Sequence, residues 1–217
     1  MINKIAVIGS GTMGNGIAHV FAQHGFTVHL ADVSRDALDR AIKTIAGNMD
    51  RQAAKGQITA TAKQEALARL HTSTDVKDAV AGAGLVIEAA TENEEVKGAI
   101  FRDLDRAAPP DAILASNTSS ISITRIASVT RRPEKVIGMH FMNPVPVMKL
   151  VEIINGFATD AAVTRTVSEL ALGLGKTPCI VNDYPGFVSN RILMPMINEA
   201  VQALFEGVAG VEEIDTV

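Results

Sequence analysis

A histidine and a glutamate are spaced so that they could form a proton-transferring pair. His140 lies in an apolar segment, 135–141, and Glu152 lies in a second apolar segment, 148–154. If both segments are strands and the chain reverses near Pro146, the two side chains stand opposite each other across an antiparallel pair. A carboxylate fixes the tautomer of an imidazole and raises its basicity, which suits a general base near neutral pH. A lone histidine in an apolar strand is more often a packed core residue, and the opposing glutamate is what favours catalysis.

A glycine-spaced loop directly after an apolar run predicts a dinucleotide-binding site. The run is 5–8 and the loop is Gly9-Ser10-Gly11-Thr12-Met13-Gly14. Gly9 permits a tight turn, Gly11 lets the backbone approach a pyrophosphate, and Gly14 lets the next helix pack against the strand. The exposed N–H groups at the start of that helix, together with its dipole, favour phosphate charge.

An acid stands at the carboxyl end of the next predicted strand, 26–31. Asp32 lies about 20 residues after the loop, where a carboxylate binds the ribose hydroxyls of NAD and repels the extra phosphate of NADP. The sequence therefore predicts NAD as the cofactor. NADP remains an alternative, because the nearby Arg35 could accommodate its extra phosphate. Asp32 could also cap the helix that begins near Ser34, and one short polar side chain can do both.

Hydroxyl and amide side chains follow two further predicted strands, 85–90 and 112–115. Thr91-Glu92-Asn93 comes after the first, and Ser116-Asn117-Thr118-Ser119-Ser120 comes after the second. Ligands bind at the carboxyl ends of parallel strands, so we expect these side chains to meet a ligand. We also expect Ser120 or a neighbour to cap the short helix that follows.

Strands that alternate with helices predict an α/β fold with a Rossmann-type dinucleotide-binding domain. Two helices, 34–55 and 60–70, form a helical excursion between strands. Arg51 and Lys55 share a face of the first helix, and this face is either a solvated basic surface or an anion site. The other predicted elements are helices from 93 to 107 and from 160 to 173, a strand over 177–181, and a long apolar helix over 188–206.

Composition limits the possible partners. The net charge of −4 gives no overall field for nucleic acid, and no apolar run approaches the roughly 18 residues of a membrane span. The strand begins too near the N-terminus for a signal peptide. Cys179 is the only cysteine, so the chain can form no internal disulfide, and we expect this residue to be buried. The side chains of His19, His24, His29 and His71 form no cluster of metal ligands. We therefore expect a cytoplasmic protein that binds no nucleic acid, membrane or metal.

Five motifs in order resemble the L-3-hydroxyacyl-CoA dehydrogenase family over essentially the whole chain, and within it the bacterial branch acting on 3-hydroxybutyryl-CoA. They are the glycine loop, the cluster 116–120, His140-Phe141-Met142-Asn143-Pro144-Val145-Pro146, Glu152, and Pro185-Gly186-Phe187-Val188-Ser189-Asn190-Arg191. The resemblance implies NAD-dependent oxidation of a short 3-hydroxyacyl-CoA to the 3-ketoacyl-CoA, and the reverse reaction.

The resemblance also implies a role for individual residues. His140 would be the general base and Glu152 its orienting partner. Ser119 would hydrogen-bond the reacting oxygen, and Asn190 would help to place the substrate. The residues expected to contact NAD are Gly9, Gly11, Thr12, Met13, Gly14, Asp32, Glu92, Lys97, Asn117 and Asn143. Lys55, with Asn48 as a second contact, would bind the phosphates of coenzyme A.

The turn at 183–187 marks the one plausible domain boundary. We assign 1–184 to the NAD-binding domain and 185–217 to the first part of an all-helical domain, which in the family completes the substrate cleft and forms a homodimer. The chain is thus expected to be a fragment, and the apolar face of its last long helix is expected to be exposed. Two alternatives remain open: a gulonate-type sugar-acid dehydrogenase, and a non-catalytic NAD-binding relative of the lens crystallin kind.

Overall fold

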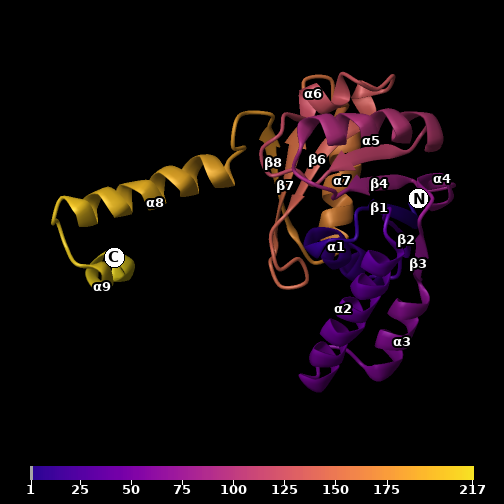
Figure 1. Ribbon diagram of the computed structural model, residues 1–217, viewed down its shortest axis with the longest axis horizontal. Coiled ribbons are helices and arrows are strands. Elements are labelled where there is room, and N and C mark those ends of the chain that lie inside the picture. The colour runs from indigo at the N-terminus through magenta and orange to yellow at the C-terminus, as the bar shows by residue number, and fades with distance from the viewer. Residues whose placement is uncertain (1) are drawn as a thin grey trace.

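The strands of the computed structural model, which describes residues 2–217, form a single sheet in the order β3-β2-β1-β4-β5-β6-β7-β8 (Figure 1). Strands β1 to β6 run parallel, β7 is antiparallel to β6, and β8 is parallel to β7. The strands are β1 (Lys4–Ile8), β2 (Thr27–Ala31), β3 (Leu70–Ser73), β4 (Leu85–Glu88), β5 (Ile113–Ser116), β6 (Val136–Phe141), β7 (Leu150–Asn155) and β8 (Thr177–Asn182). The predicted Rossmann-type α/β fold is confirmed.

Helices cover both faces of the sheet because the central strands are apolar on both sides. One core joins the sheet to α1, α2 and α7 through Ile17, Leu38 and Val167, and the other joins it to α5 and α6 through Phe101 and Ile126. The helices are α1 (Thr12–Gln23), α2 (Arg35–Ala54), α3 (Ala60–Ala68), α4 (Val76–Val80), α5 (Glu94–Ala107), α6 (Ile123–Ala127), the 3-10 helix η1 (Pro133–Lys135), α7 (Ala161–Gly173), α8 (Ser189–Phe205) and α9 (Val211–Thr216).

The segment after the helical excursion differs from the prediction. The helix predicted to reach residue 70 ends at Ala68, and Leu70–Ser73 is a strand that pairs in parallel with β2. Strand β3 is only half-buried at the sheet edge, so its sequence lacks the apolar run that reveals an inner strand. Helix α4, also unpredicted, has five residues. Ser122, rather than Ser120, accepts the capping hydrogen bond of α6.

Cys179 was predicted to be buried, and this prediction is wrong. It lies on β8, the last strand of the sheet, where it is exposed. The neighbouring Ile180 keeps 58% of its surface exposed. An edge strand has a partner on one side only, so an apolar sequence there does not guarantee burial.

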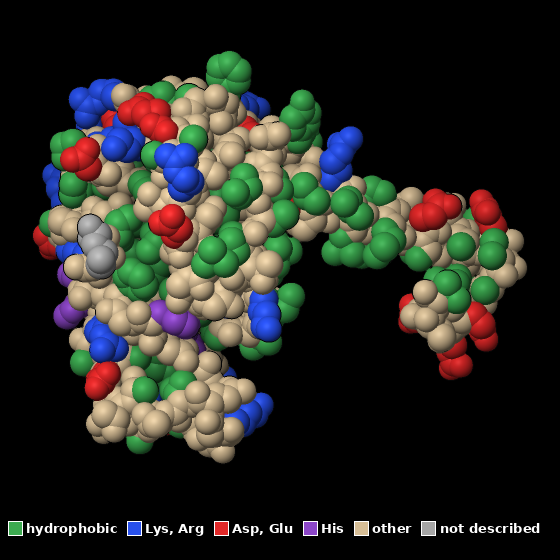
Figure 2. All heavy atoms as spheres, turned by 180° about the vertical axis from the view of Figure 1, so that it is seen from behind, with side chains coloured by type: hydrophobic (Ala, Val, Ile, Leu, Met, Phe, Trp, Pro, Cys, Tyr) green, Lys and Arg blue, Asp and Glu red, His purple; other side chains and the backbone are tan. Residues whose placement is uncertain are grey.

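Helix α8 projects from the sheet as an arm that ends in α9 (Figure 1). None of its residues is buried, and Figure 2 shows hydrophobic side chains gathered along the arm. The expected exposed apolar face is confirmed; its large members are Ile192, Leu193, Met194, Met196, Ile197, Val201, Leu204 and Phe205. The division into domains at residues 184 and 185 stays a prediction. No helix in residues 2–217 has the length and apolar character needed to cross a membrane.

Candidate active site

Strands β6 and β7 place His140 and Glu152 directly opposite each other, as the sequence predicts. Nδ1 of His140 lies 2.9 Å from Oε2 of Glu152, and both side chains are buried. A carboxylate can only accept a hydrogen bond, so Nδ1 carries the proton in this contact. The geometry therefore leaves Nε2 of His140 as the nitrogen that can accept a proton from a ligand.

Glu152 is held by the first residues of α8 as well as by His140. Its Oε1 accepts hydrogen bonds from the backbone N–H of Val188 and of Ser189, and the Ser189 hydroxyl donates to Oε2 at 2.8 Å. Burial acts to raise the pKa of Glu152, but the hydrogen bonds from Ser189 and His140 outweigh it and lower the pKa below its usual value. Glu152 thus stays ionised beside the imidazole. The sequence motif contained Ser189, but its type alone did not reveal this role.

The loops after β4 and β5 meet at Glu92. Its Oε1 accepts hydrogen bonds from the Thr118 hydroxyl at 2.6 Å, from the Ser119 backbone N–H at 2.8 Å and from the Ser119 hydroxyl at 3.0 Å. The side-chain amide of Asn190 donates to the Ser119 carbonyl at 3.0 Å. The structure thus brings Glu92, Ser119 and Asn190 together, although they are far apart in the sequence.

A pocket of about 310 Å³ lies where these loops converge. Asn117 contributes to its wall and is fixed there, because its Oδ1 accepts a hydrogen bond from the backbone N–H of Phe141. The pocket therefore joins the imidazole, the hydroxyl of Ser119 and the glycine loop in one space. It is lined by Met13, Ala89, Ala90, Glu92, Asn117, Ser119, His140, Phe141, Met142 and Asn143.

The glycine loop fits a pyrophosphate. Gly9 has a positive φ of 100°, and a Cβ on Gly14 would lie 1.8 Å from the Gly9 carbonyl oxygen, so both positions require glycine. A Cβ on Gly11 would meet no atom within 4 Å, which leaves open space above the N-terminus of α1. Helices α2 to α7 each receive a side-chain cap, whereas α1, whose N-cap residue is Gly11, has none. Its first N–H groups can therefore meet phosphate oxygens.

Asp32 is fixed in position beside the loop. Its Oδ2 accepts hydrogen bonds from the backbone N–H and the hydroxyl of Ser10, and its Oδ1 accepts one from the backbone N–H of Ser34. Partial burial acts to raise the pKa of Asp32, but these hydrogen bonds outweigh it and hold the pKa below its usual value. Ser34, not Asp32, caps α2. An ionised carboxylate at this strand end suits the ribose of NAD.

Lys97 is buried and does not line the pocket. Its side chain is only 1% exposed, and Nζ contacts both carboxylate oxygens of Glu88 at 2.8 and 2.9 Å. Nζ also lies 3.4 Å from Oε2 of Glu92. The sequence did not suggest a role for Glu88, since it falls inside an apolar strand.

The residues expected to bind coenzyme A lie on the helical excursion. Lys55 is exposed at the end of α2. Asn48 lies earlier in the same helix, where its side-chain oxygen accepts a hydrogen bond from Arg51. Neither lines the pocket that contains His140. Their contact with coenzyme A stays a prediction.

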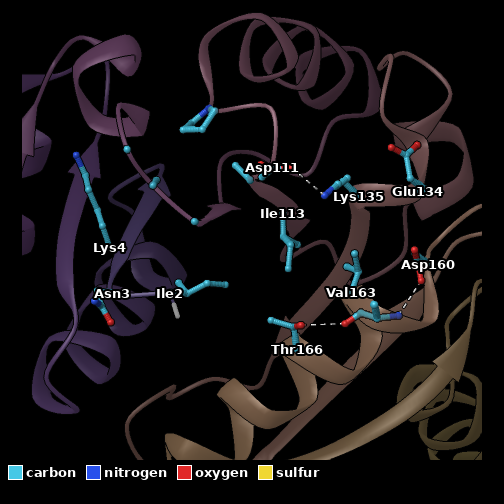
Figure 3. A pocket seen from close by; sticks show the side chains of 16 residues that line it. Ile2, Asn3, Lys4, Asp111, Ile113, Glu134, Lys135, Asp160, Val163 and Thr166 are labelled. Carbon is cyan, nitrogen blue, oxygen red and sulfur yellow. Dashed lines mark hydrogen bonds and ion pairs between the residues drawn. The ribbon is translucent and has the colours of Figure 1, made fainter.

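A larger pocket of about 690 Å³ lies at the opposite, amino end of the parallel strands (Figure 3). Lys4 at the start of β1 and Ile113 at the start of β5 line it, with Lys135 paired to Asp111 at its rim (Figure 3). Ligands of open α/β sheets bind at the carboxyl ends of the strands, so its size does not make it the active site. Within residues 2–217, no group of three or more His, Cys, Asp or Glu side chains is arranged to hold a metal ion.

Two family descriptions match the chain. Residues 4–184 match "3-hydroxyacyl-CoA dehydrogenase, NAD binding domain", and residues 186–217 match "3-hydroxyacyl-CoA dehydrogenase, C-terminal domain". The chain is 53% identical to the 3-hydroxybutyryl-CoA dehydrogenase of Bradyrhizobium diazoefficiens, over 99% of this chain and 73% of that protein. It is 49% identical to the 3-hydroxyadipyl-CoA dehydrogenase of Escherichia coli, over 99% of this chain and 45% of that protein.

A solved crystal structure has the same fold as this chain. The crystal structure of (S)-3-hydroxybutyryl-CoA dehydrogenase from Ralstonia eutropha superposes with a TM-score of 0.95 at 47% sequence identity. The superposition covers 98% of this chain and 75% of that one. The fold and the order of its elements are therefore shared over nearly all of the chain described above.

Proposed function

Because the chain belongs to the 3-hydroxyacyl-CoA dehydrogenase family and is an NAD-dependent oxidoreductase, we propose that it oxidises (S)-3-hydroxybutyryl-CoA to acetoacetyl-CoA, and catalyses the reverse reaction. NAD is its cofactor, and an acyl-CoA is its substrate. The proposal concerns the short acyl chain and the residues that carry the chemistry. The observation that carries it is the His140–Glu152 contact of 2.9 Å, which opens onto the same pocket as Ser119 and the glycine loop.

His140 acts as the general base in this proposal. Nε2 accepts the proton of the 3-hydroxyl group while the hydrogen on the same carbon leaves with its electron pair. Bound NAD supplies the acceptor for that hydride. The imidazolium that forms is stabilised by Glu152, which is already oriented and ionised. In the reverse direction the imidazolium returns the proton to the alkoxide oxygen, so one pair serves both directions.

In this proposal, Ser119 stabilises the charge on the reacting oxygen, and Asn190 holds Ser119 in place. The hydroxyl of Ser119 lines the pocket, where it can donate a hydrogen bond to the oxygen as its charge changes. The side-chain amide of Asn190 donates a hydrogen bond to the backbone carbonyl of Ser119 and so supports this loop. Asn190 therefore links the position of the hydroxyl to the start of α8.

The acyl chain is proposed to be short and uncharged. The pocket wall includes the apolar side chains of Met13, Ala89, Phe141 and Met142, which suit an aliphatic chain beside the nicotinamide. We propose that Lys55 and Asn48 hold the phosphates of coenzyme A at a distance from this pocket. Lys55 carries the positive charge that such phosphates require.

The arm formed by α8 and α9 is proposed to support a homodimer. The arm exposes a row of large apolar side chains, and such surfaces mark association sites in soluble proteins. Sedimentation velocity of this chain over a range of concentrations tests the proposal, and a monomer at every concentration would contradict it.

The test of function is the oxidation of NADH by purified protein, followed by absorbance. Acetoacetyl-CoA is the probe, with 3-oxoadipyl-CoA and a free sugar keto-acid as alternatives. The proposal predicts the highest kcat/KM for acetoacetyl-CoA. Faster turnover of 3-oxoadipyl-CoA would overturn the chain length, and turnover of the sugar keto-acid alone would favour the gulonate-type alternative.

A further inference from the structure

The buried ion pair between Glu88 and Lys97 is connected to the active site by a second ion pair, between Lys97 and Glu92. Glu88 is completely buried, and its carboxylate is saturated with donors. Two of them come from Lys97, one from the Ser116 hydroxyl at 2.7 Å, and one from the Ala90 backbone N–H at 2.8 Å. The pair therefore fixes the ends of both β4 and β5.

Lys97 has one donor left over after Glu88. An ammonium group has three N–H donors, and Nζ also forms an ion pair with Oε2 of Glu92, 3.4 Å away. The other oxygen of Glu92 faces Thr118 and Ser119. One carboxylate oxygen thus faces the lysine, and this orients the other toward the loop that carries the Ser119 hydroxyl.

The charges agree with this arrangement. Glu88 and Lys97 neutralise each other inside the protein, which leaves Glu92 with the net negative charge at the pocket. Partial burial acts to raise the pKa of Glu92, but hydrogen bonds from Thr118 and Ser119 and the charge of Lys97 outweigh it and lower the pKa. Glu92 therefore remains an acceptor for the Ser119 backbone N–H when the Ser119 hydroxyl rotates toward a substrate oxygen.

We propose that Glu88 and Lys97 are positioning residues for the dehydrogenase reaction, acting through Glu92 to hold the Ser119 hydroxyl at the wall of the pocket. The inference rests on the proposed function, because it concerns Ser119 in that reaction. It gives Lys97 a role that requires no contact with NAD. It also gives a reason for two charged side chains in an apolar interior, where a pair of hydrophobic residues often makes the folded protein equally stable or more stable.

The test compares Glu88→Gln, Lys97→Met and the double variant Glu88→Gln/Lys97→Met. Each single variant leaves one buried charge without its partner and can fail to fold. The double variant removes both charges and so preserves folding, while Glu92 loses its lysine. Asp105→Asn is the matched control, since Asp105 is a buried carboxylate at the other end of α5 that pairs with Arg131 and Arg132.

The expected result is a folded double variant whose kcat with acetoacetyl-CoA falls on the order of tenfold or more, by a larger factor than any change in its Kd for NADH. The control should lose thermal stability without losing kcat. A double variant with wild-type kcat would overturn the proposal, and so would a rise in the Kd for NADH with no change in kcat. A wild-type protein that binds NADH but turns over no acyl-CoA would instead contradict the proposed function.

Discussion

Asn190, at the start of α8, donates a hydrogen bond to the carbonyl oxygen of Ser119, 3.0 Å away. The contact joins the segment after β8, the last strand of the sheet, to the hydroxyl-bearing loop after β5. A neighbouring contact does the same for the imidazole, because Ser189 donates to Glu152. The start of α8 is therefore part of the active site, and changes there should affect the chemical step.

Replacing Asn190 tests this connection. Asn190→Ala should lower kcat about tenfold, because Ser119 loses the donor that fixes its carbonyl. Asn190→Asp should be worse, since it places a second acceptor against that carbonyl. Asn198→Ala, an exposed position on the same helix, is the control. Steady-state kinetics with acetoacetyl-CoA decides, and equal rates for all three variants would argue against a role for Asn190.

Glu152→Gln keeps the size of the side chain and removes its charge. The imidazolium then lacks a counter-charge, and the amide can present its N–H group to Nδ1 of His140 and favour the wrong tautomer. We expect kcat to fall on the order of a hundredfold with little change in NADH affinity. Glu169→Gln on α7 is the surface control. A Glu152→Gln enzyme with full activity would contradict the pair.

Lys176 holds the loop between β6 and β7 through two hydrogen bonds. Its buried ammonium donates to the carbonyl oxygens of Val145 and Met148, and burial lowers its pKa. Lys176→Met should leave these carbonyls unpaired, at a cost of about 1–3 kcal/mol in the free energy of unfolding. It should also raise the KM for NAD, because Asn143 lies on the same loop. Lys149→Met, exposed on that loop, is the control, and identical unfolding curves for the two variants would refute this role.

The stability of the protein should depend on pH through His29. Its ring centroid lies 4.8 Å from that of His71, and burial, followed by the charges of Lys4 and His71, lowers the pKa of His29 to about 4. An unfolded histidine titrates near pH 6.5, so the unfolded chain binds more protons between these values. The contribution is complete above about pH 6.5 and is lost as pH falls toward 4.

His29→Gln should therefore flatten the loss of stability on acidification. Thermal unfolding at about pH 7 and about pH 5 measures this, because the two values lie on either side of the unfolded pKa. The wild type should lose more of its Tm between them than the variant. An equal loss in both proteins would show that other groups cause the acid sensitivity.

The sequence predicted those parts of the site that depend on strand register and turn chemistry. His140 and Glu152 could be placed opposite each other because a two-residue period and one reversal point determine the pairing. The glycine loop and Asp32 could be placed because each backbone position has a distinct steric or electrostatic requirement. These signals are local, so one sequence suffices to reveal them.

The remaining features depend on contacts between segments that are distant in the sequence. Glu88 sits in an apolar strand, and its partner Lys97 comes from a helix whose buried face is known only after folding. The strand at Leu70–Ser73 has too few apolar residues to be recognised, and it forms because β2 offers it a free edge. Cys179 is exposed because β8 ends the sheet, which no pattern within β8 records.

The role of His140 as the catalytic base is tested by the His140→Gln variant, with turnover of acetoacetyl-CoA and binding of NADH measured on the same preparation. We expect kcat to fall at least about a hundredfold, because the site loses its general base. The Kd for NADH should stay within about twofold, since the glycine loop and Asp32, rather than His140, are expected to hold the pyrophosphate and the ribose. A variant that retains its rate, or one that loses rate and NADH binding together, would contradict the assignment of His140 as the catalytic base.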